Sequence, residues 1–367
     1  MKVSVSRAEL VNLIGKIQSV VPSKPAIPIL SNILIEAIDS QLVISATDLV
    51  VSIRAFIDAK VIKEGSITLP ARRFFQLVRE LTTPVVDLDV QDNGIAVITS
   101  GSSHFKLHGM NKNDFPALPD FSSASNFSLE SSLLKDMLVR TAFAAAKDDS
   151  RQILNGIYTE LQGNDLMFIG TDGKRLAKVH NNIPFETSKK IQFVIPLKAV
   201  EEMIKILEDD QNAKLTIMHD KVALEVGSLC LITKLLAGQY PDVARIFPDK
   251  KNMKVINLHK EELSTLLRQV SLFTSELSHS VKFSFQSGQL KLQAVSNDIG
   301  EGKVSMPIDY SENKLDIAFN PYFFMDILKH CKDETASFGI TDSYNPGLIT
   351  DSTSAQYVIM PMRLSLD

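Results

Sequence analysis

Apolar and polar residues follow one pattern three times along this chain. From Val3, Phe127 and Ile256 onward, a short stretch of alternating apolar and polar residues is followed by apolar residues spaced three and four apart. The first stretch predicts a β-strand and the second predicts an amphipathic helix. Two inward positions of these helices correspond in all three copies: Leu10, Leu134 and Leu263, and Ile14, Leu138 and Leu267.

The rest of each copy repeats as well. The segment from Ile29 returns at Ile153, 124 positions later. A further strand, break and helix begin near Ile67, Phe193 and Asp316. The matching positions are Ile33, Ile157 and Val281 in the first of these segments, Pro70, Pro196 and Asn320 at the break, and Phe74, Val200 and Phe324 on the apolar face of the helix.

Three near-equal copies predict three α+β domains, each with two helices packed on antiparallel sheets. We place them at residues 1–119, 127–247 and 254–367, because Pro and Ser gather before the second domain and Lys before the third. The six expected helices span residues 6–19, 71–81, 131–147, 197–209, 260–270 and 321–332. Duplicated domains without a common purpose are one explanation. We favour the other, in which near-equal units build one shared surface.

Composition narrows the class of protein. Of 367 residues, 44% are apolar and 22% are charged, which is typical of a folded soluble protein. The net charge of −4 excludes a protein that coats nucleic acid with a uniformly basic surface. Cys230 and Cys331 stand far apart, so neither a disulfide framework nor a C-x-x-C site is expected. Charged residues interrupt the first twenty positions, and no apolar run approaches the roughly 18 residues of a membrane span. We expect a cytoplasmic protein without membrane insertion.

No catalytic or metal-binding signature stands out. The G-T-D-G-K-R run at 170–175 would need Gly in place of Phe168 and Ser or Thr in place of Arg175 to form a phosphate loop. Asp87 and Asp89 alternate with apolar residues on a predicted strand, which favours a solvated strand face over a metal site. The histidines lack metal-ligand spacing, and no G-x-S-x-G elbow accompanies the serines. We therefore expect no catalytic residue, cofactor or metal.

Positive charge gathers on the predicted helices. Together the six helices are net positive, whereas the remaining strands and loops are net negative. Lys24 and Arg151, which follow the first and third helices, add to the same side if the helix ends line one surface. Such a surface attracts phosphates without reading bases. Chance clustering on solvated helix faces is the alternative.

Eight short motifs, in order along the whole chain, closely resemble those of the bacterial DNA sliding clamp family, the beta subunit of the replicative DNA polymerase III holoenzyme. They are P-A-I-P-I-L at Pro25, T-D-L at Thr47, P-A-R-R-F-F at Pro70, D-F-P at Asp114, L-N-G at Leu154, T-D-G-K-R-L-A at Thr171, Q-Y-P-D at Gln239 and Y-V-I-M-P-M-R-L from Tyr357. The ordered set is far more specific than any one of its members.

The resemblance implies a fold and a function. Two chains of three domains are expected to close a head-to-tail homodimeric ring, with helices lining the hole and sheets on the rim. The ring would encircle double-stranded DNA without sequence specificity and act as a DNA polymerase processivity factor, not as an enzyme. The implied partners, held through short peptides, are the replicative polymerase subunit, the clamp loader, repair polymerases and mismatch-repair proteins. The implied location is the nucleoid.

The resemblance also implies site residues. The peptide-binding pocket between the second and third domains is expected to comprise Leu154, Thr171, Gly173, Lys174, Arg175, Leu176, Pro241, Ile246, Asn320, Phe323, Tyr344, Val358, Met360, Pro361, Met362 and Arg363. The expected DNA-facing residues are Lys24, Arg72, Arg73, Lys147, Arg151 and Lys198. The expected dimer interface places Phe105 and Leu107 near Leu272 and Phe273 of the other copy.

Two pocket positions depart from the family pattern. Lys174 stands where a histidine is familiar, and Tyr344 stands where a smaller aliphatic residue is, which predicts an altered peptide preference. Two other functions are alternatives. A peptide-binding scaffold that never encloses DNA is the main alternative, and a nucleotide-handling enzyme that uses Asp172, Lys174 and Arg175 is the more distant one.

Overall fold

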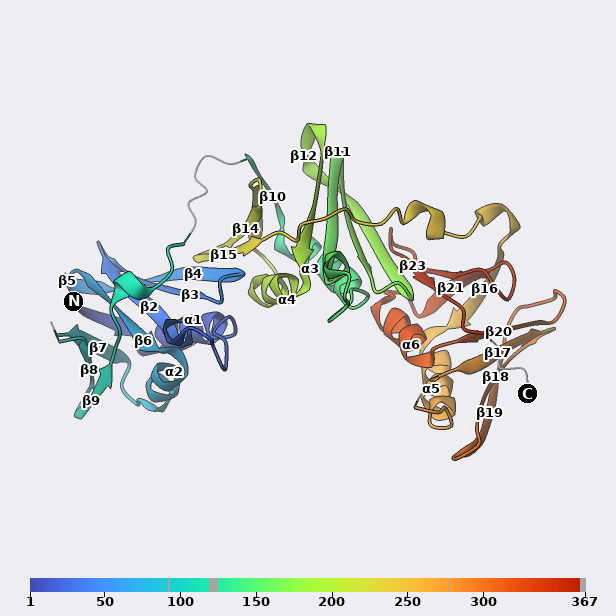
Figure 1. Cartoon of the computed structure of the whole chain (residues 1–367), viewed down its shortest axis with the longest axis horizontal. Coiled ribbons are helices and arrows are strands. Elements are labelled where there is room, and N and C mark those ends of the chain that lie inside the picture. Colours follow the sequence, from blue (N-terminus) through green and yellow to red (C-terminus); the bar gives the residue numbers. More distant parts are fainter. Residues whose placement is uncertain (92, 119–124, 277, 364–367) are drawn as a thin grey trace. The chain divides into compact units, whose positions relative to one another are not determined.

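A computed structural model describes residues 1–91, 93–118, 125–276 and 278–363 (Figure 1). The chain forms two compact units, and each is described by itself. The first unit comprises Met1–Lys135 and Lys198–Leu235, and the second comprises Asp136–Leu197 and Leu236–Asp367.

Six α-helices begin where the pattern predicts, to within one residue. They are α1 (Arg7–Ile17), α2 (Ala71–Glu80), α3 (Ser131–Ala142), α4 (Leu197–Ile206), α5 (Lys260–Ser271) and α6 (Pro321–His330). Short 3-10 helices occur at η1 (Pro28–Ser31), η2 (Lys112–Asp114), η3 (Gln152–Leu154), η4 (Ala244–Ile246) and η5 (Lys250–Asn252). Polar caps explain some of the starts: the Ser6 hydroxyl accepts from Glu9 N before α1, and the Asn320 side chain accepts from Tyr322 N before α6.

The repeated apolar positions form the core, as the pattern predicts. The two corresponding positions of α1, α3 and α5 are at most 1% exposed in all three copies, and so are the matched strand and helix positions of the later segments. Each such side chain contributes about 1.5–3 kcal/mol relative to an exposed one. The threefold repeat of the sequence is therefore a repeat of buried positions.

Helix α3 is shorter than predicted, and the expectation that it reaches residue 147 is wrong. It ends at Ala142 because Phe143 has other partners. The Phe143 carbonyl accepts a hydrogen bond from Arg175 Nη2 at 2.9 Å, and its ring stacks on His330 with ring centres 4.1 Å apart. Ala146 N then donates to Leu154 O at 3.0 Å instead of continuing the helix.

Two antiparallel sheets build the first unit. The five-stranded sheet has the order β5 (Lys60–Lys63), β1 (Lys2–Ser6), β7 (Val85–Val90), β8 (Ile95–Ser100), β9 (Ser103–His108). The eight-stranded sheet has the order β10 (Ser125–Glu130), β13 (Asn212–Ile217), β14 (Lys221–Val226), β15 (Leu229–Lys234), β4 (Val51–Asp58), β3 (Gln41–Thr47), β2 (Asn32–Ile38), β6 (Gly65–Pro70). Helix α1 packs on α2 and on β4 (Figure 1).

Two antiparallel sheets also build the second unit. The six-stranded sheet has the order β11 (Gly156–Thr171), β12 (Arg175–Pro196), β23 (Gln356–Ile359), β22 (Gly347–Thr350), β21 (Thr335–Ile340), β16 (Lys254–His259). The four-stranded sheet has the order β19 (Gly300–Pro307), β18 (Gln289–Ser296), β17 (Val281–Gln286), β20 (Leu315–Phe319). Helix α5 packs on α6 and on β18 and β19 (Figure 1).

The sheets run across the predicted domain boundaries. In the first unit β15 pairs with β4, so that Leu229 lies opposite Ala55. In the second unit β12 pairs with β23, so that Arg175 lies opposite Ile359. Backbone hydrogen bonds thus join neighbouring repeats edge to edge, which explains why contacts divide the chain into two units although its pattern repeats three times. The exact domain limits stay a prediction.

A pocket and three charged or apolar surfaces as the candidate functional site

The second unit holds a cavity of about 640 Å³. Buried Leu176 and Val358 belong both to its lining and to an apolar cluster with Ile169 and Leu348. The cavity is lined by residues of three regions: Thr171, Gly173, Arg175 and Leu176; Arg245, Ile246, Phe247, Pro248, Asp249 and Asn252; and Thr341, Asp342, Tyr344, Asn345, Pro346, Val358 and Met360. An apolar floor with a few polar groups on its rim is typical of a ligand site.

The T-D-G-K-R run forms the tight turn between β11 and β12 on one side of this cavity. The Asp172 carboxylate accepts hydrogen bonds from the backbone of Lys174 at 2.9 Å and of Arg175 at 3.0 Å. Thr171 Oγ1 donates to Arg175 O at 2.6 Å. Gly173 has φ +83°, a left-handed conformation that favours glycine. The run is therefore a structural turn that starts β12.

Arg175 is held from three sides. Its guanidinium donates to Asp172 at 3.2 Å, to Asp326 on α6 at 2.5 Å and to the Phe143 carbonyl. It also lies against the Phe323 ring, 4.6 Å from the ring centre. Since its side chain is 11% exposed and its donors have protein partners, Arg175 fixes the wall of the cavity.

Of the two residues that depart from the family pattern, Tyr344 lines the cavity and Lys174 does not. Tyr344 lines the cavity and is 86% exposed, on a loop in which the Asp342 carboxylate accepts from the backbone of Tyr344 and Asn345 at 2.8 Å each. These hydrogen bonds hold the pKa of Asp342 below its usual value. Lys174 is exposed and is absent from the lining, but its carbonyl accepts from Met360 N at 2.9 Å.

The structure brings together half of the predicted pocket residues. Those that line the cavity are Thr171, Gly173, Arg175, Leu176, Ile246, Tyr344, Val358 and Met360. Those that do not line it are Leu154, Lys174, Pro241, Asn320, Phe323, Pro361, Met362 and Arg363. Several of the latter have structural roles: Leu154 is buried, Asn320 caps α6, and Met362 N donates to Ala318 O.

Sequence reasoning missed nine lining residues: Arg245, Phe247, Pro248, Asp249, Asn252, Thr341, Asp342, Asn345 and Pro346. They belong to two Pro-containing segments outside the α-helices and β-strands. A signal existed for the first, because it directly follows the Q-Y-P-D motif. The second shows no pattern beyond turn-forming residues.

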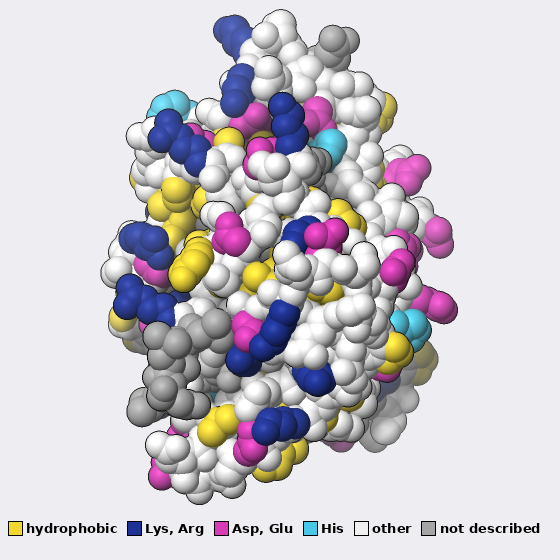
Figure 2. All heavy atoms as spheres, turned by 90° about the vertical axis from the view of Figure 1, so that its right-hand side faces the viewer, with side chains coloured by type: hydrophobic (Ala, Val, Ile, Leu, Met, Phe, Trp, Pro, Cys, Tyr) yellow, Lys and Arg dark blue, Asp and Glu magenta, His cyan; other side chains and the backbone are white. Residues whose placement is uncertain are grey.

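The six predicted DNA-facing residues differ in whether a carboxylate pairs with them. Arg72 and Arg73 are exposed on α2, and no ion pair involves them among the described residues. Lys24 and Lys147 are also exposed, although Lys147 lies beyond the end of α3. Arg151 pairs with Asp149 at 2.9 Å, which holds the pKa of Asp149 at about 2, and Lys198 pairs with Asp48. On the face seen in Figure 2, basic and acidic side chains intermingle.

Two of the predicted dimer residues lie in an edge strand, and a third packs against one. Phe105 and Leu107 belong to β9, the last strand of its sheet in the first unit, and Phe105 is 39% exposed. In the second unit Leu272 follows α5 and is 72% exposed. Phe273 packs against Gly302 on β19, which is also the last strand of its sheet.

The structure also shows where the residues considered for metal binding or thiol chemistry lie. Val86 and Leu88 are buried, whereas Asp87 and Asp89 alternate with them and face Ser4 and Lys2. Burial raises the pKa of the Cys230 and Cys331 thiols to about 12. In the described ranges, no cluster of His, Cys, Asp or Glu could hold a metal ion, and no helix is long and apolar enough to cross a membrane.

Comparison with known proteins defines the class. The chain belongs to the DNA polymerase III beta subunit family: its N-terminal, central and C-terminal domains match at residues 1–119, 128–242 and 244–363. It is 50% identical to the beta sliding clamp of Chlamydia muridarum and 52% identical to that of Chlamydia pneumoniae, in each case over all of both chains.

Solved structures agree with this assignment. A sliding clamp from Pseudomonas aeruginosa bound to griselimycin has a TM-score of 0.95 and 27% identity over 99% of this chain and 100% of that one. A sliding clamp from Bacillus subtilis has a TM-score of 0.95 and 26% identity over 99% of each chain. The predicted fold of three clamp domains is confirmed, and so is the predicted function as a non-catalytic DNA polymerase processivity factor, a sliding clamp.

Proposed function

We propose that two copies of this chain close head to tail around duplex DNA, and that the cavity of the second unit binds short extended peptides of replication and repair proteins. The observation that carries the second part is the cavity itself, with its apolar floor and polar rim. Of the sixteen residues named from the sequence, we propose the eight that line the cavity, with the nine further lining residues, as its wall, and the other eight as residues that flank or support it.

The strand pairing around the cavity restricts how a peptide binds. Strand β12 pairs with β11 on one side and with β23 on the other, and β23 also pairs with β22. A peptide therefore cannot extend this part of the sheet by adding a strand. It must be held by side chains that enter the cavity, where Met360 offers a flexible apolar contact and exposed Tyr344 a flat one.

The seam of the proposed ring is formed by two sheet edges. Strand β9 carries exposed Phe105, and β19 lies beside Phe273, which directly follows exposed Leu272. Free strand edges with apolar side chains are ready to pair with another chain. A head-to-tail seam that occurs twice about a twofold axis closes the ring and pairs both of these edges.

The proposed DNA contacts are made first by cations that have no ion-pair partner among the described residues. Arg72 and Arg73 on α2 are the best placed, followed by Lys24 and Lys147, whereas Arg151 and Lys198 must leave or share a carboxylate. Loose phosphate contacts suffice in a closed ring, because topology retains the DNA and the contacts need only permit sliding. This role places the protein at the nucleoid in the cytoplasm.

The proposed peptide partners are the replicative polymerase subunit, the clamp loader, repair polymerases and mismatch-repair proteins. Griselimycin is a suitable probe because a solved sliding clamp contains it. Met360→Ala removes an apolar contact from the cavity and is expected to weaken griselimycin binding about tenfold in calorimetric titration.

Ile62→Ala is the matched control, since it truncates an apolar side chain that is 57% exposed in the first unit. It is expected to leave the dissociation constant unchanged. Equal affinities of the wild type and Met360→Ala would exclude this cavity as the site. A polymerase peptide that displaces griselimycin would identify the natural occupant.

A further inference from the structure

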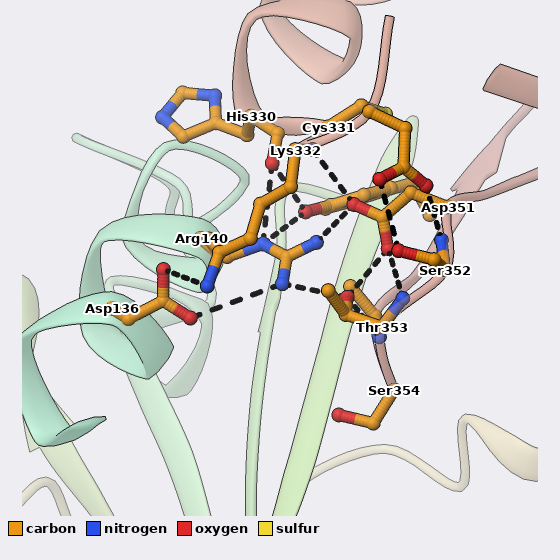
Figure 3. A network of polar contacts seen from close by, with 12 residues as sticks. Asp136, Arg140, His330, Cys331, Lys332, Asp351, Ser352, Thr353 and Ser354 are labelled. Atoms are coloured by element: carbon orange, nitrogen blue, oxygen red, sulfur yellow. Dashed lines mark hydrogen bonds and ion pairs between the residues drawn. The ribbon is translucent and has the colours of Figure 1, made fainter. Parts of the chain in front are cut away.

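Arg140 lies in the second unit on α3 and does not line the cavity (Figure 3). Its side chain is 4% exposed. Nε donates to the His330 carbonyl at 3.2 Å and to the Tyr357 hydroxyl at 3.0 Å, Nη1 donates to Thr353 Oγ1 at 2.7 Å, and Nη2 bonds to Asp351. One guanidinium therefore joins α3 to the end of α6, to the turn after β22 and to β23.

The carboxylate at the centre of this network is fully buried. Asp351 accepts hydrogen bonds from Lys332 N at 2.9 Å and from Thr353 N at 3.0 Å in addition to Arg140. Burial acts to raise its pKa, but these hydrogen bonds and the Arg140 charge together lower the pKa below its usual value. Asp351 thus stays ionised and keeps the guanidinium in place.

One segment that Arg140 joins, β23, forms part of the cavity on its other side, and another, α6, holds the cavity wall. Tyr357 contacts Arg140, and the next residue, Val358, lines the cavity; consecutive residues of a strand face opposite sides. Helix α6 ends at His330 and carries Asp326, which binds Arg175 on the cavity wall. The position of Arg140 therefore sets the positions of β23 and α6.

A second set of contacts links the two arginines. The Phe143 and His330 rings stack with an angle of 9° between them. Arg175 donates to the carbonyl of Phe143, and Arg140 donates to the carbonyl of His330. A shift of the Arg140 network is consequently transmitted to the Arg175 side of the cavity through packed groups.

The repeat provides a natural comparison. Lys16 stands 124 positions before Arg140, at the equivalent place on α1 in the first unit. It has one recorded carboxylate partner, Glu208, whose side chain is 48% exposed. A lysine makes a point contact there, whereas the planar fork of Arg140 binds four groups at once.

We propose that Arg140 is a positioning residue for peptide binding: without contacting the ligand, its fork holds β23 and α6 at the spacing that the cavity requires. This inference rests on the proposed function of the cavity. It predicts that a change at Arg140 alters the affinity of the folded protein and not merely its stability.

The test compares Arg140→Lys with Lys16→Met in the full chain, at a temperature at which circular dichroism shows both variants folded. Arg140→Lys keeps the charge beside Asp351 but loses the fork, and griselimycin is expected to bind it about tenfold more weakly. Lys16→Met is expected to bind like the wild type. If Arg140→Lys also binds like the wild type, the proposal is wrong.

A milder variant covers the case in which Arg140→Lys does not fold. Tyr357→Phe deletes the hydroxyl that accepts from Arg140 and that donates to the His330 carbonyl at 3.1 Å. It is expected to bind griselimycin more weakly than the wild type, and unchanged binding would overturn the proposal.

Hydrogen exchange separates a failure of this inference from a failure of the proposed function. Arg140→Lys or Tyr357→Phe is expected to speed exchange of the Met360 amide, which donates to Lys174 O, and of the paired amides of β23 and β12. Unchanged exchange would overturn the positioning role whatever the ligand. A wild type that binds no griselimycin, with faster exchange in the variants, would contradict the peptide pocket alone.

Discussion

At the scale of single residues, two largely buried arginines connect segments of the second unit. Arg140 and Arg175 each receive partners from segments far apart in the sequence, and each donates to a main-chain carbonyl as well as to a carboxylate. Partners of this kind leave no trace in local sequence patterns. The sequence predicted Arg175 as a residue of the peptide-binding pocket, and it gave no functional expectation for Arg140. Only the structure shows both as parts of the frame behind the cavity.

The Arg140–Asp351 pair leads to a prediction about stability. Asp351→Asn removes the charge of a fully buried side chain and leaves Arg140 with only the more distant Asp136 carboxylate, 3.9 Å from Nη1. We expect the free energy of unfolding in urea to fall by about 3–5 kcal/mol. Asp209→Asn is the control, because Asp209 is 76% exposed and lies 3.8 Å from Lys135, and it is expected to change stability little. A similar small effect of Asp351→Asn would show that the pair contributes no net stability.

At the scale of elements, the helices and their buried positions could be predicted because each depends on local spacing and capping. The end of α3 could not, since Phe143 leaves the helix for partners at Arg175 and His330. Nor could the pairing of β4 with β15, which joins residues some 180 positions apart by backbone hydrogen bonds that any side chain permits. The strand side of the cavity was predicted through resemblance, whereas only Ile246 and Tyr344 were predicted in its two irregular segments.

The junction of α3 and α6 leads to a prediction about pH. Burial lowers the pKa of His330 below 6.5, and the nearby charges of Lys329 and Arg140 lower it further, against the opposing effects of the Asp326 carbonyl and carboxylate. The unfolded chain therefore takes up a proton at this residue at a higher pH than the folded chain. Stability contributed by neutral His330 is present above pH 6.5 and is lost as the pH falls below it.

His330→Phe retains a ring against Phe143 but cannot titrate. It loses the hydrogen bond from Nδ1 to the Asp326 carbonyl, so it is expected to be less stable than the wild type at pH 7.5. Urea unfolding at pH 7.5 and 5.5 is expected to show a smaller loss of stability on acidification in His330→Phe than in the wild type. An equal loss in both proteins would assign the pH dependence to other groups.

At the scale of the whole molecule, two kinds of strand matter for the ring: those that join repeats inside the chain, and terminal strands that a second copy can reach. Inside the chain, β15–β4 and β12–β23 join repeats by backbone hydrogen bonds. Strands β9 and β19 end their sheets without a further strand among the described residues. The proposed ring holds DNA by closure, so the ring account requires that the edges of β9 and β19 meet between two copies.

The most direct test of the ring is retention on circular DNA. The clamp loader places the labelled protein on a nicked circle, gel filtration removes free protein, and a restriction enzyme then cuts the circle. The account predicts that the wild type stays with the circle at high salt and leaves after cutting. Leu272→Asp, which charges the exposed residue of the proposed seam, is expected to remain near 40.6 kDa in light scattering and to be retained on neither form. Protein that stays equally on circular and cut DNA, or that never stays on the circle, would contradict the topological hold.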